Sequence, residues 1–110
     1  MNTWLVHIPT APGPADEDQA KIQYTHTAHN KSLLAAGKIV FGGEILGHQE
    51  DNNEDPSPGG KVTGNAFVVQ ADTETDVWTM IQDDPYAKSG NWKVVDAKVT
   101  PVKVTVIRPL

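Results

Sequence analysis

The order of the apolar patterns along the chain constrains the fold more than any other feature. Apolar and polar residues alternate in four stretches, which predicts strands over residues 4–8, 38–46, 61–71 and 94–107. Two stretches with helical spacing predict helices over residues 16–37 and 73–84. The resulting βαββαβ order is that of the split βαβ, or ferredoxin-like, arrangement. We therefore expect an α+β fold in which both helices cover one face of a four-stranded antiparallel sheet.

Capping signals mark where the two helices begin. Asp16 and Gln19 have the spacing of a capping box, and Thr73 and Asp76 repeat that spacing. The first helix is expected to end near Gly37, and apolar and histidine residues recur along it every three or four positions. The members of this inward-facing stripe are Ile22, His26, His29, Leu33 and Ala36. Two histidines are therefore expected on the face of the helix that meets the sheet.

The strand patterns indicate that both faces of the sheet need burial. Ile39, Phe41 and Ile45 alternate and are expected on one face of the second strand. The last strand carries valines in both phases, and the change of phase at Thr100–Pro101 predicts a bulge or a break. Since the helices cover one face only, an apolar second face calls for a partner. We expect a homodimer in which two sheets pack face to face.

Composition bounds the class of protein. The chain has 110 residues, enough for one domain over residues 1–110. A net charge of −5 with nine Lys plus Arg, and no basic stripe, argues against nucleic acid as a partner. The chain has no cysteine, so thiolate chemistry and cysteine-based zinc sites are excluded. Neither a signal peptide nor a membrane span is predicted, and we expect a soluble cytoplasmic protein with no membrane partner.

One long polar segment separates the second and third predicted strands. It covers residues 47–60, is acidic, and contains Pro56 and Pro58, which predicts a mobile loop. A solvated tether between two strands explains this composition. A lid that closes over a pocket is the functional alternative to this simpler explanation.

The segment around Asp84–Pro85 carries the main chemical signal. A residue before proline is pushed out of the helical region, so the second helix should stop at Asp84. Asp83 and Asp84 would then lie at a helix C-terminus, where the macrodipole disfavours a carboxylate by roughly 0.3–1 kcal/mol. A nearby cation or hydrogen-bond donor would compensate. His26 on the first helix is the candidate donor, because the two helices lie side by side in a split βαβ fold.

Several short motifs together resemble the YCII-related family. They are His26, Gly43, Gly64–Asn65, Asp84–Pro85–Tyr86 and Gly90–Asn91–Trp92, spread over nearly the whole chain. The resemblance implies a small dimeric α+β barrel of the muconolactone isomerase-like superfamily. It also implies that His26 and Asp84 form a catalytic pair. Relatives in that superfamily carry out proton abstraction, isomerisation or elimination on small cyclic substrates without a cofactor.

Three positions depart from the pattern of that family. Gln23 stands where the family often has an arginine, Thr10 where an aspartate commonly ends the first strand, and Asn65 where serine is frequent. The missing arginine argues against a carboxylate clamp on the substrate. All three replacements are polar, which is compatible with a pocket retuned for another substrate.

Other residues are candidates for the walls of the pocket, and each also has a structural explanation. His7, His29, Asn65, Tyr86 and Trp92 are candidate substrate-binding residues. His29 is more simply explained as a boundary residue, and His7 points to the side opposite Trp4 and Val6. Packing in the dimer explains Tyr86 and Trp92 equally well. A metal site built from His26 and His29 with Asp84 or His7 is a further alternative, but zinc motifs on helices place histidines four residues apart. We expect no metal and no cofactor.

Two functions from different classes remain open. The first is a cofactor-independent lyase or isomerase acting on a small cyclic, aromatic or polyketide-like metabolite, with His26 as the acid or base and Asp84 as its orienting partner. The second is a non-catalytic module that binds a small molecule or has a regulatory role, in which the pair only holds the fold. A cofactor-free monooxygenase is a third alternative.

Overall fold

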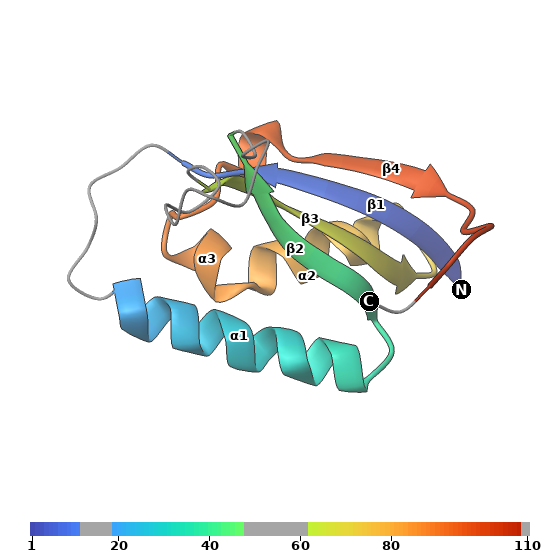
Figure 1. The fold of residues 1–110 in the computed structure, drawn as a ribbon, viewed down its shortest axis with the longest axis horizontal. Coiled ribbons are helices and arrows are strands. Elements are labelled where there is room, and N and C mark those ends of the chain that lie inside the picture. The colour runs from blue at the N-terminus through green and yellow to red at the C-terminus, as the bar shows by residue number, and fades with distance from the viewer. Residues whose placement is uncertain (12–18, 48–61, 109–110) are drawn as a thin grey trace, which may run out of the picture.

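The computed structural model describes residues 1–11, 19–47 and 62–108. Its elements in chain order are β1 (Asn2–Pro9), α1 (Gln19–Ala35), β2 (Ile39–Leu46), β3 (Val62–Ala71), α2 (Glu74–Asp83), α3 (Pro85–Lys88), the 3₁₀ turn η1 (Val94–Asp96) and β4 (Lys98–Val102). The strands form one antiparallel sheet in the order β2-β3-β1-β4, and α1 and α2 lie on the same face of it (Figure 1). The predicted α+β class and split βαβ order are confirmed.

The helix boundaries follow the sequence signals where the structure describes them. Thr73 is the N-cap of α2, and its hydroxyl accepts a hydrogen bond from the backbone N–H of Asp76 at 3.1 Å. Helix α1 ends before Gly37, whose φ of +75° is the left-handed conformation that glycine adopts most easily. Asp16, the start of the predicted first capping box, lies outside the described residues, as do residues 48–60 of the predicted loop.

Three details of the strand predictions are wrong. The expected last strand over 94–107 is shorter, because residues 94–96 form η1 and β4 ends at Val102. Of the predicted bulge or break at Thr100–Pro101, the bulge is absent, because β4 pairs with β1 in a single register, but the strand does end one residue later, at Val102. Proline is tolerated there because β4 is an edge strand. In β2 the register shifts between Ile39 and Phe41, so these two side chains lie on opposite faces, Ile39 buried and Phe41 exposed.

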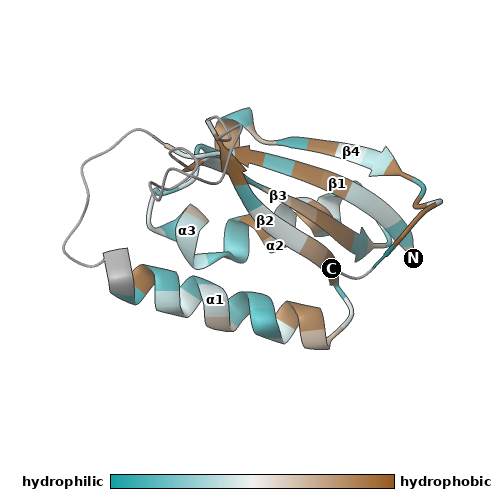
Figure 2. Ribbon diagram, in the orientation of Figure 1, coloured by the Kyte–Doolittle hydropathy of each residue, from teal (hydrophilic) through white to brown (hydrophobic). Residues whose placement is uncertain are grey.

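The core lies between the sheet and the helices. Alternate residues of β1, Val6 and Ile8, point into it and are almost completely buried together with Val77 of α2. Each such side chain contributes roughly 1.5–3 kcal/mol of burial free energy. Figure 2 shows hydrophobic stretches in β1 and β3, whereas α1 is mostly hydrophilic or intermediate in character. Helix α1 therefore packs through a narrow stripe, and that stripe contains His26.

The opposite face of the sheet carries apolar side chains as well. Leu5 and Phe41 are exposed on it, and Val68 lies between them in the register. Residues 103–108, which follow β4, line an apolar cavity of about 930 Å³ together with these side chains. No helix in the part of the chain that the structure describes is long and apolar enough to cross a membrane.

Candidate functional site

Asp84 lies at the junction of two helices and caps both of them. Its backbone N–H donates to the carbonyl of Ile81 at 3.2 Å and closes α2. Its carboxylate accepts the backbone N–H of Tyr86 at 2.9 Å and so caps α3, with Pro85 in the first helical turn. The sequence prediction missed α3. The carboxylate does not simply oppose the dipole of α2, because it also meets an unpaired N–H group at the start of the next helix.

His26 reaches Asp84 from α1. Its Nδ1 lies 2.7 Å from Oδ1 of Asp84, and the two residues are only 7% and 4% exposed. A carboxylate accepts hydrogen bonds, so Nδ1 carries the proton that is shared with Asp84. The other ring nitrogen, Nε2, lies 3.0 Å from Nδ2 of Asn30, one helical turn further along α1. Hydrogen bonds to Asp84 and Asn30 therefore fix the orientation of the imidazole.

Two aromatic rings enclose His26. The ring of Tyr86 stacks on the imidazole with 3.9 Å between centroids and 15° between planes. Trp92 meets the imidazole edge-on at 5.5 Å, and its indole N–H donates to Oδ1 of Asn65 at 3.1 Å. Thr10 pairs with Trp92 through an isolated β-bridge, which ties the end of β1 to the segment after α3. The imidazole is thus held by packing on its faces as well as by hydrogen bonds at its edges.

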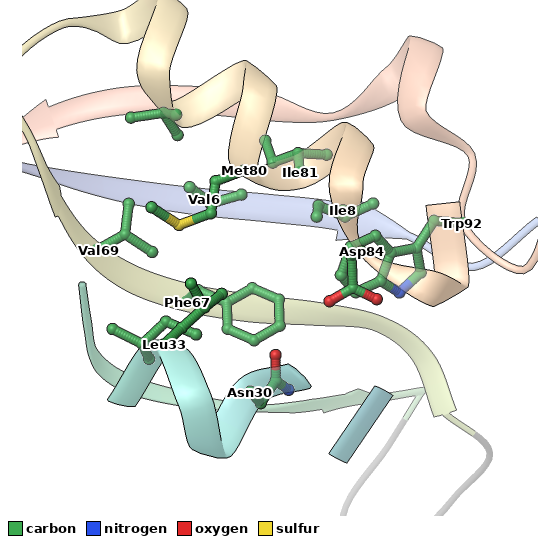
Figure 3. Close-up of a pocket in the computed structure, with 12 residues that line it drawn as sticks. Val6, Ile8, Asn30, Leu33, Phe67, Val69, Met80, Ile81, Asp84 and Trp92 are labelled. Atoms are coloured by element: carbon green, nitrogen blue, oxygen red, sulfur yellow. The ribbon is translucent and has the colours of Figure 1, made fainter. Parts of the chain in front are cut away.

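Two hollows of very different size lie next to the His26–Asp84 pair. A small apolar cavity of about 20 Å³ lies beneath Asp84, Asn30 and Trp92, whose side chains project toward it in Figure 3, and it holds at most about one water molecule. A groove of about 580 Å³ lies between α1 and β2, and its wall includes His26, Asn30 and Tyr86. The groove has the size of a site for a small molecule, whereas the small cavity belongs to the core.

The wall of the groove combines polar and apolar side chains. Asn65, Tyr86 and Glu44 lie around His26, and we call this part of the wall the polar end. Helix α1 adds further polar side chains to the wall: Gln23, Thr27, Asn30 and Lys31. The remaining apolar and glycine wall consists of Leu34, Ile39, Val40, Phe41, Gly42, Gly43 and Phe67. Such a hollow suits a small flat molecule that has both apolar surface and polar substituents.

The charge around the phenol of Tyr86 keeps that group neutral. Burial raises the pKa of Tyr86 above its ordinary value, and the nearby carboxylates of Glu44 and Asp84 raise it further. The phenol therefore remains a hydrogen-bond donor at neutral pH. At the polar end of the groove, a neutral O–H group and an imidazole thus lie together.

The structure brings five of the seven predicted site residues together and separates the other two. His26, Asp84, Asn65, Tyr86 and Trp92 form one connected cluster. His7 is exposed and, by strand alternation with buried Val6 and Ile8, lies on the outer face of the sheet. His29 lines a different cavity, of about 380 Å³, together with residues of α2. Its Nε2 is buried there without a hydrogen-bond partner among the described residues.

Two residues at the site were not predicted. Asn30 follows His26 by four positions, a spacing that places two side chains side by side on a helix and that could have indicated the contact. Glu44 follows Gly43 on β2 and faces Asn65 across the strand pair. Its position depends on the register shift in β2, which the sequence pattern did not reveal. Gln23, one of the three departures from the family pattern, also lines the groove.

The described residues contain no grouping that suits a metal ion. No set of three or more His, Cys, Asp or Glu side chains within residues 1–11, 19–47 and 62–108 could hold one. The metal alternative requires His26 and His29 to face one ion. They instead line separate cavities, and Nδ1 of His26 is paired with Asp84.

Comparison with known proteins gives consistent matches over most of the chain. The YCII-related domain matches residues 3–101. The derivative of benzaldehyde biosynthesis cluster protein C of Emericella nidulans is 36% identical over 88 residues, which are 79% of this chain and 85% of that protein. The xenovulene A biosynthesis cluster protein asL2 of Sarocladium schorii is 28% identical over 105 residues, covering 91% and 86% of the two chains.

A solved structure shares the fold. It is 5-chloro-2-hydroxyhydroquinone dehydrochlorinase from Burkholderia phenoliruptrix in complex with 2,5-dihydroxybenzoquinone. The TM-score is 0.65 at 20% sequence identity, over 91% of this chain and 93% of the dehydrochlorinase chain. At that identity the match establishes a common fold.

Proposed function

This chain belongs to the YCII-related domain family, and on that premise we propose that it is a cofactor-independent enzyme that moves protons on a small cyclic, aromatic or polyketide-like metabolite. The reaction class is isomerisation, dehydration or another elimination, or cyclisation. The observation that carries the proposal is the buried His26–Asp84 pair, with Nδ1 and Oδ1 2.7 Å apart beside a groove of about 580 Å³.

The pair has the arrangement that general acid–base catalysis requires. Asp84 accepts a hydrogen bond from the N–H group at Nδ1, which leaves the lone pair of the imidazole on Nε2. Nε2 takes a proton from an O–H or C–H group of the substrate, and the imidazolium that forms is stabilised by the Asp84 carboxylate. The same proton then returns to another carbon in an isomerisation, or leaves with the departing hydroxyl group as water in a dehydration. No proton is gained or lost over the cycle.

The surrounding residues have roles that follow from their contacts. Tyr86 holds the imidazole plane by stacking and presents a neutral phenol near the same end of the groove. The indole N–H of Trp92 orients the side-chain amide of Asn65. The Nδ2 group of that amide makes one long contact, of 3.5 Å, with the carbonyl of Gly43. The same Nδ2 group would also donate a hydrogen bond to a ligand oxygen. These groups would bind polar substituents of the ring while His26 transfers the proton.

The relatives support the substrate class in the proposal. Two of them belong by name to gene clusters that make benzaldehyde derivatives and xenovulene A, and the structural relative acts on a chlorinated hydroxyhydroquinone. A hydroxylated aromatic or quinonoid ring is a flat molecule of the kind that fits between α1 and the glycine backbone of β2. Secondary metabolism is the proposed setting of the reaction.

We also propose that the enzyme is a homodimer through its sheet faces. The exposed side chains of Leu5 and Phe41 and the apolar cavity of about 930 Å³ beneath residues 103–108 support an interface there. Sedimentation velocity at micromolar concentration tests this. A single species at the mass of a monomer would contradict the dimer without affecting the assignment of the groove.

The test of the enzymatic proposal is substrate-proton exchange in D₂O, followed by NMR. Hydroxylated benzaldehydes and 2,5-dihydroxybenzoquinone are the first compounds to screen, and each is compared in wild type and His26→Ala. We expect exchange or conversion only with wild type, while circular dichroism shows that the variant remains folded. Equal rates in both proteins would refute the catalytic role of His26. Ligand binding without turnover in either protein would favour the alternative of a non-catalytic binding module.

A further inference from the structure

Both ring nitrogens of His26 already have partners inside the chain. Nδ1 donates to Oδ1 of Asp84 at 2.7 Å, and Nε2 lies 3.0 Å from Nδ2 of Asn30. Because Nδ1 carries the proton, Nε2 holds the lone pair, and the Asn30 amide N–H donates to it. A base whose only lone pair accepts a hydrogen bond cannot take a proton until that bond opens. The resting site is therefore closed at the atom that the reaction needs.

The two bonds differ in how easily they can be replaced. Asp84 is 4% exposed and is also held by the backbone N–H of Tyr86 at 2.9 Å, so its carboxylate is fixed. Asn30 is only partly buried, and it lines both the large groove and the small cavity beneath Asp84. Figure 3 shows its amide at the edge of that small cavity. Rotation of this side chain moves the amide toward the groove and breaks no other hydrogen bond that the structure records.

We infer that Asn30 is a positioning residue, which holds Nε2 of His26 as an acceptor at the wall of the groove until a hydroxyl group of the ligand displaces the Asn30 amide. The inference rests on the proposed function and narrows it. The preferred ligand is a ring that carries an O–H group, a phenol or an enol. A ring of the same shape without a hydroxyl group has no donor to offer to Nε2 and leaves the Asn30–His26 bond in place.

The exchange is energetically feasible because one hydrogen bond replaces another. Breaking a neutral hydrogen bond in a protein costs little when an equivalent bond forms. The imidazole keeps its position during the exchange, because Asp84 holds Nδ1 and Tyr86 stacks on the ring face. The amide that the ligand displaces then pairs with water.

The first half of the inference is tested by ¹⁵N NMR of the histidine rings. In wild type we expect the Nε2 signal of His26 at the position of a hydrogen-bonded acceptor nitrogen. In Asn30→Leu it should move downfield, toward the position of an unbonded acceptor nitrogen. In Asn30→Asp, which places an acceptor against Nε2, it should move upfield to the position of an N–H nitrogen. Gln23→Leu, on the same wall of the groove, is the matched control and should leave the signal unchanged. An unchanged signal in both Asn30 variants overturns the inference.

The displacement step is tested with catechol and with 1,2-dimethoxybenzene, which has no hydroxyl group. Catechol should shift the side-chain amide signals of Asn30 in wild type, and 1,2-dimethoxybenzene should not. Catechol should also bind Asn30→Leu about 2–10-fold more tightly, because no Asn30 bond has to open. Equal affinity of catechol for both proteins, or unmoved Asn30 signals, overturns the displacement. Retained turnover in His26→Ala would refute the proposed function. It would not change the ¹⁵N spectra expected for wild type and the Asn30 variants, so failure of the proposed function can be told from failure of this inference.

Discussion

The carboxylate of Asp84 joins His26 across 58 positions of the chain, with 2.7 Å between Oδ1 and Nδ1. The same oxygen accepts the backbone N–H of Tyr86 at 2.9 Å, so one atom caps a helix and orients an imidazole. These two tasks make different demands on the side chain. A cap needs an oxygen acceptor on a side chain of the right length. The hydrogen bond to the imidazole needs a negative charge on that oxygen to be strong.

Asp84→Asn separates these two tasks. Asparagine caps helices as well as aspartate does, so we expect the free energy of unfolding to change less than in Asp84→Ala. Loss of the charge-assisted bond to His26 should lower kcat/KM by roughly 10–150-fold, the equivalent of about 1.5–3 kcal/mol. Steady-state kinetics and urea denaturation measure the two effects. Asp84→Ala removes both the cap and the charge, and it should cost a further 0.5–2 kcal/mol or so of stability. Full activity in Asp84→Asn would contradict the orienting role.

The His26–Asp84 contact was predictable because both signals are local. His26 falls on the inward stripe of a helix, and Asp84 precedes a proline that stops the next helix, so the split βαβ topology brings the two together. The exposed position of His7 depends only on strand alternation. The sequence pattern did not predict α3, because one turn of helix carries too few residues for a period.

The register shift in β2 and the short β4 could not be predicted from the same patterns. Ile39 and Phe41 have the spacing of one strand face, and only pairing with β3 reveals that they lie on opposite faces. The valines after Val102 alternate as a strand would, but residues 103–108 pair with no strand and instead line a cavity over the sheet. Alternation of apolar residues predicts that every second side chain is buried. It does not predict which surface buries those side chains.

The phenol of Tyr86 provides a test that needs no substrate. Its pKa is raised by burial and by the carboxylates of Glu44 and Asp84, so folded protein keeps the proton at pH values where an unfolded tyrosine, with a pKa of about 10, has lost it. The unfolded state then binds fewer protons than the folded state, and the free energy of unfolding falls as pH rises above about 10. Absorbance at 295 nm during alkaline titration follows the ionisation.

Two variants test whether the ionisation observed at high pH is that of the Tyr86 phenol. Tyr86→Phe should remove it from the titration and should flatten the loss of stability above pH 10 or so. Glu44→Gln removes one negative charge near the phenol, so the pKa of Tyr86 should fall toward its ordinary value. If the titration of Glu44→Gln matches that of wild type, Glu44 does not act on this end of the groove.

A comparison of Trp92 with Trp78 measures how much stability is lost when a buried hydrogen-bond acceptor loses its donor. The indole N–H of Trp92 donates to buried Asn65 at 3.1 Å, and that of Trp78 donates to exposed Glu74 at 3.0 Å. Trp92→Phe leaves Oδ1 of Asn65 without its donor in the core, which should lower the free energy of unfolding by about 1–3 kcal/mol beyond the loss of ring volume. In Trp78→Phe, water replaces the donor. Equal losses in thermal melts of the two variants would contradict this account.

Gly42 and Gly43 are neighbours on β2, and they face opposite sides of the sheet. A Cβ atom on Gly42 would lie 2.5 Å from the Phe67 ring, whereas one on Gly43 would meet nothing within 4 Å. Gly42→Ala should therefore push Phe67 and the groove wall out of place, which costs about 1–3 kcal/mol of stability and weakens ligand binding. Gly43→Ala keeps the groove open and should stay within about 1 kcal/mol of wild type. Chemical denaturation with ligand titration compares the pair, and equal stability would mean that Phe67 has room to move. A loss confined to Gly43→Ala would instead locate a close contact on the outer face of the sheet, where we propose the second subunit.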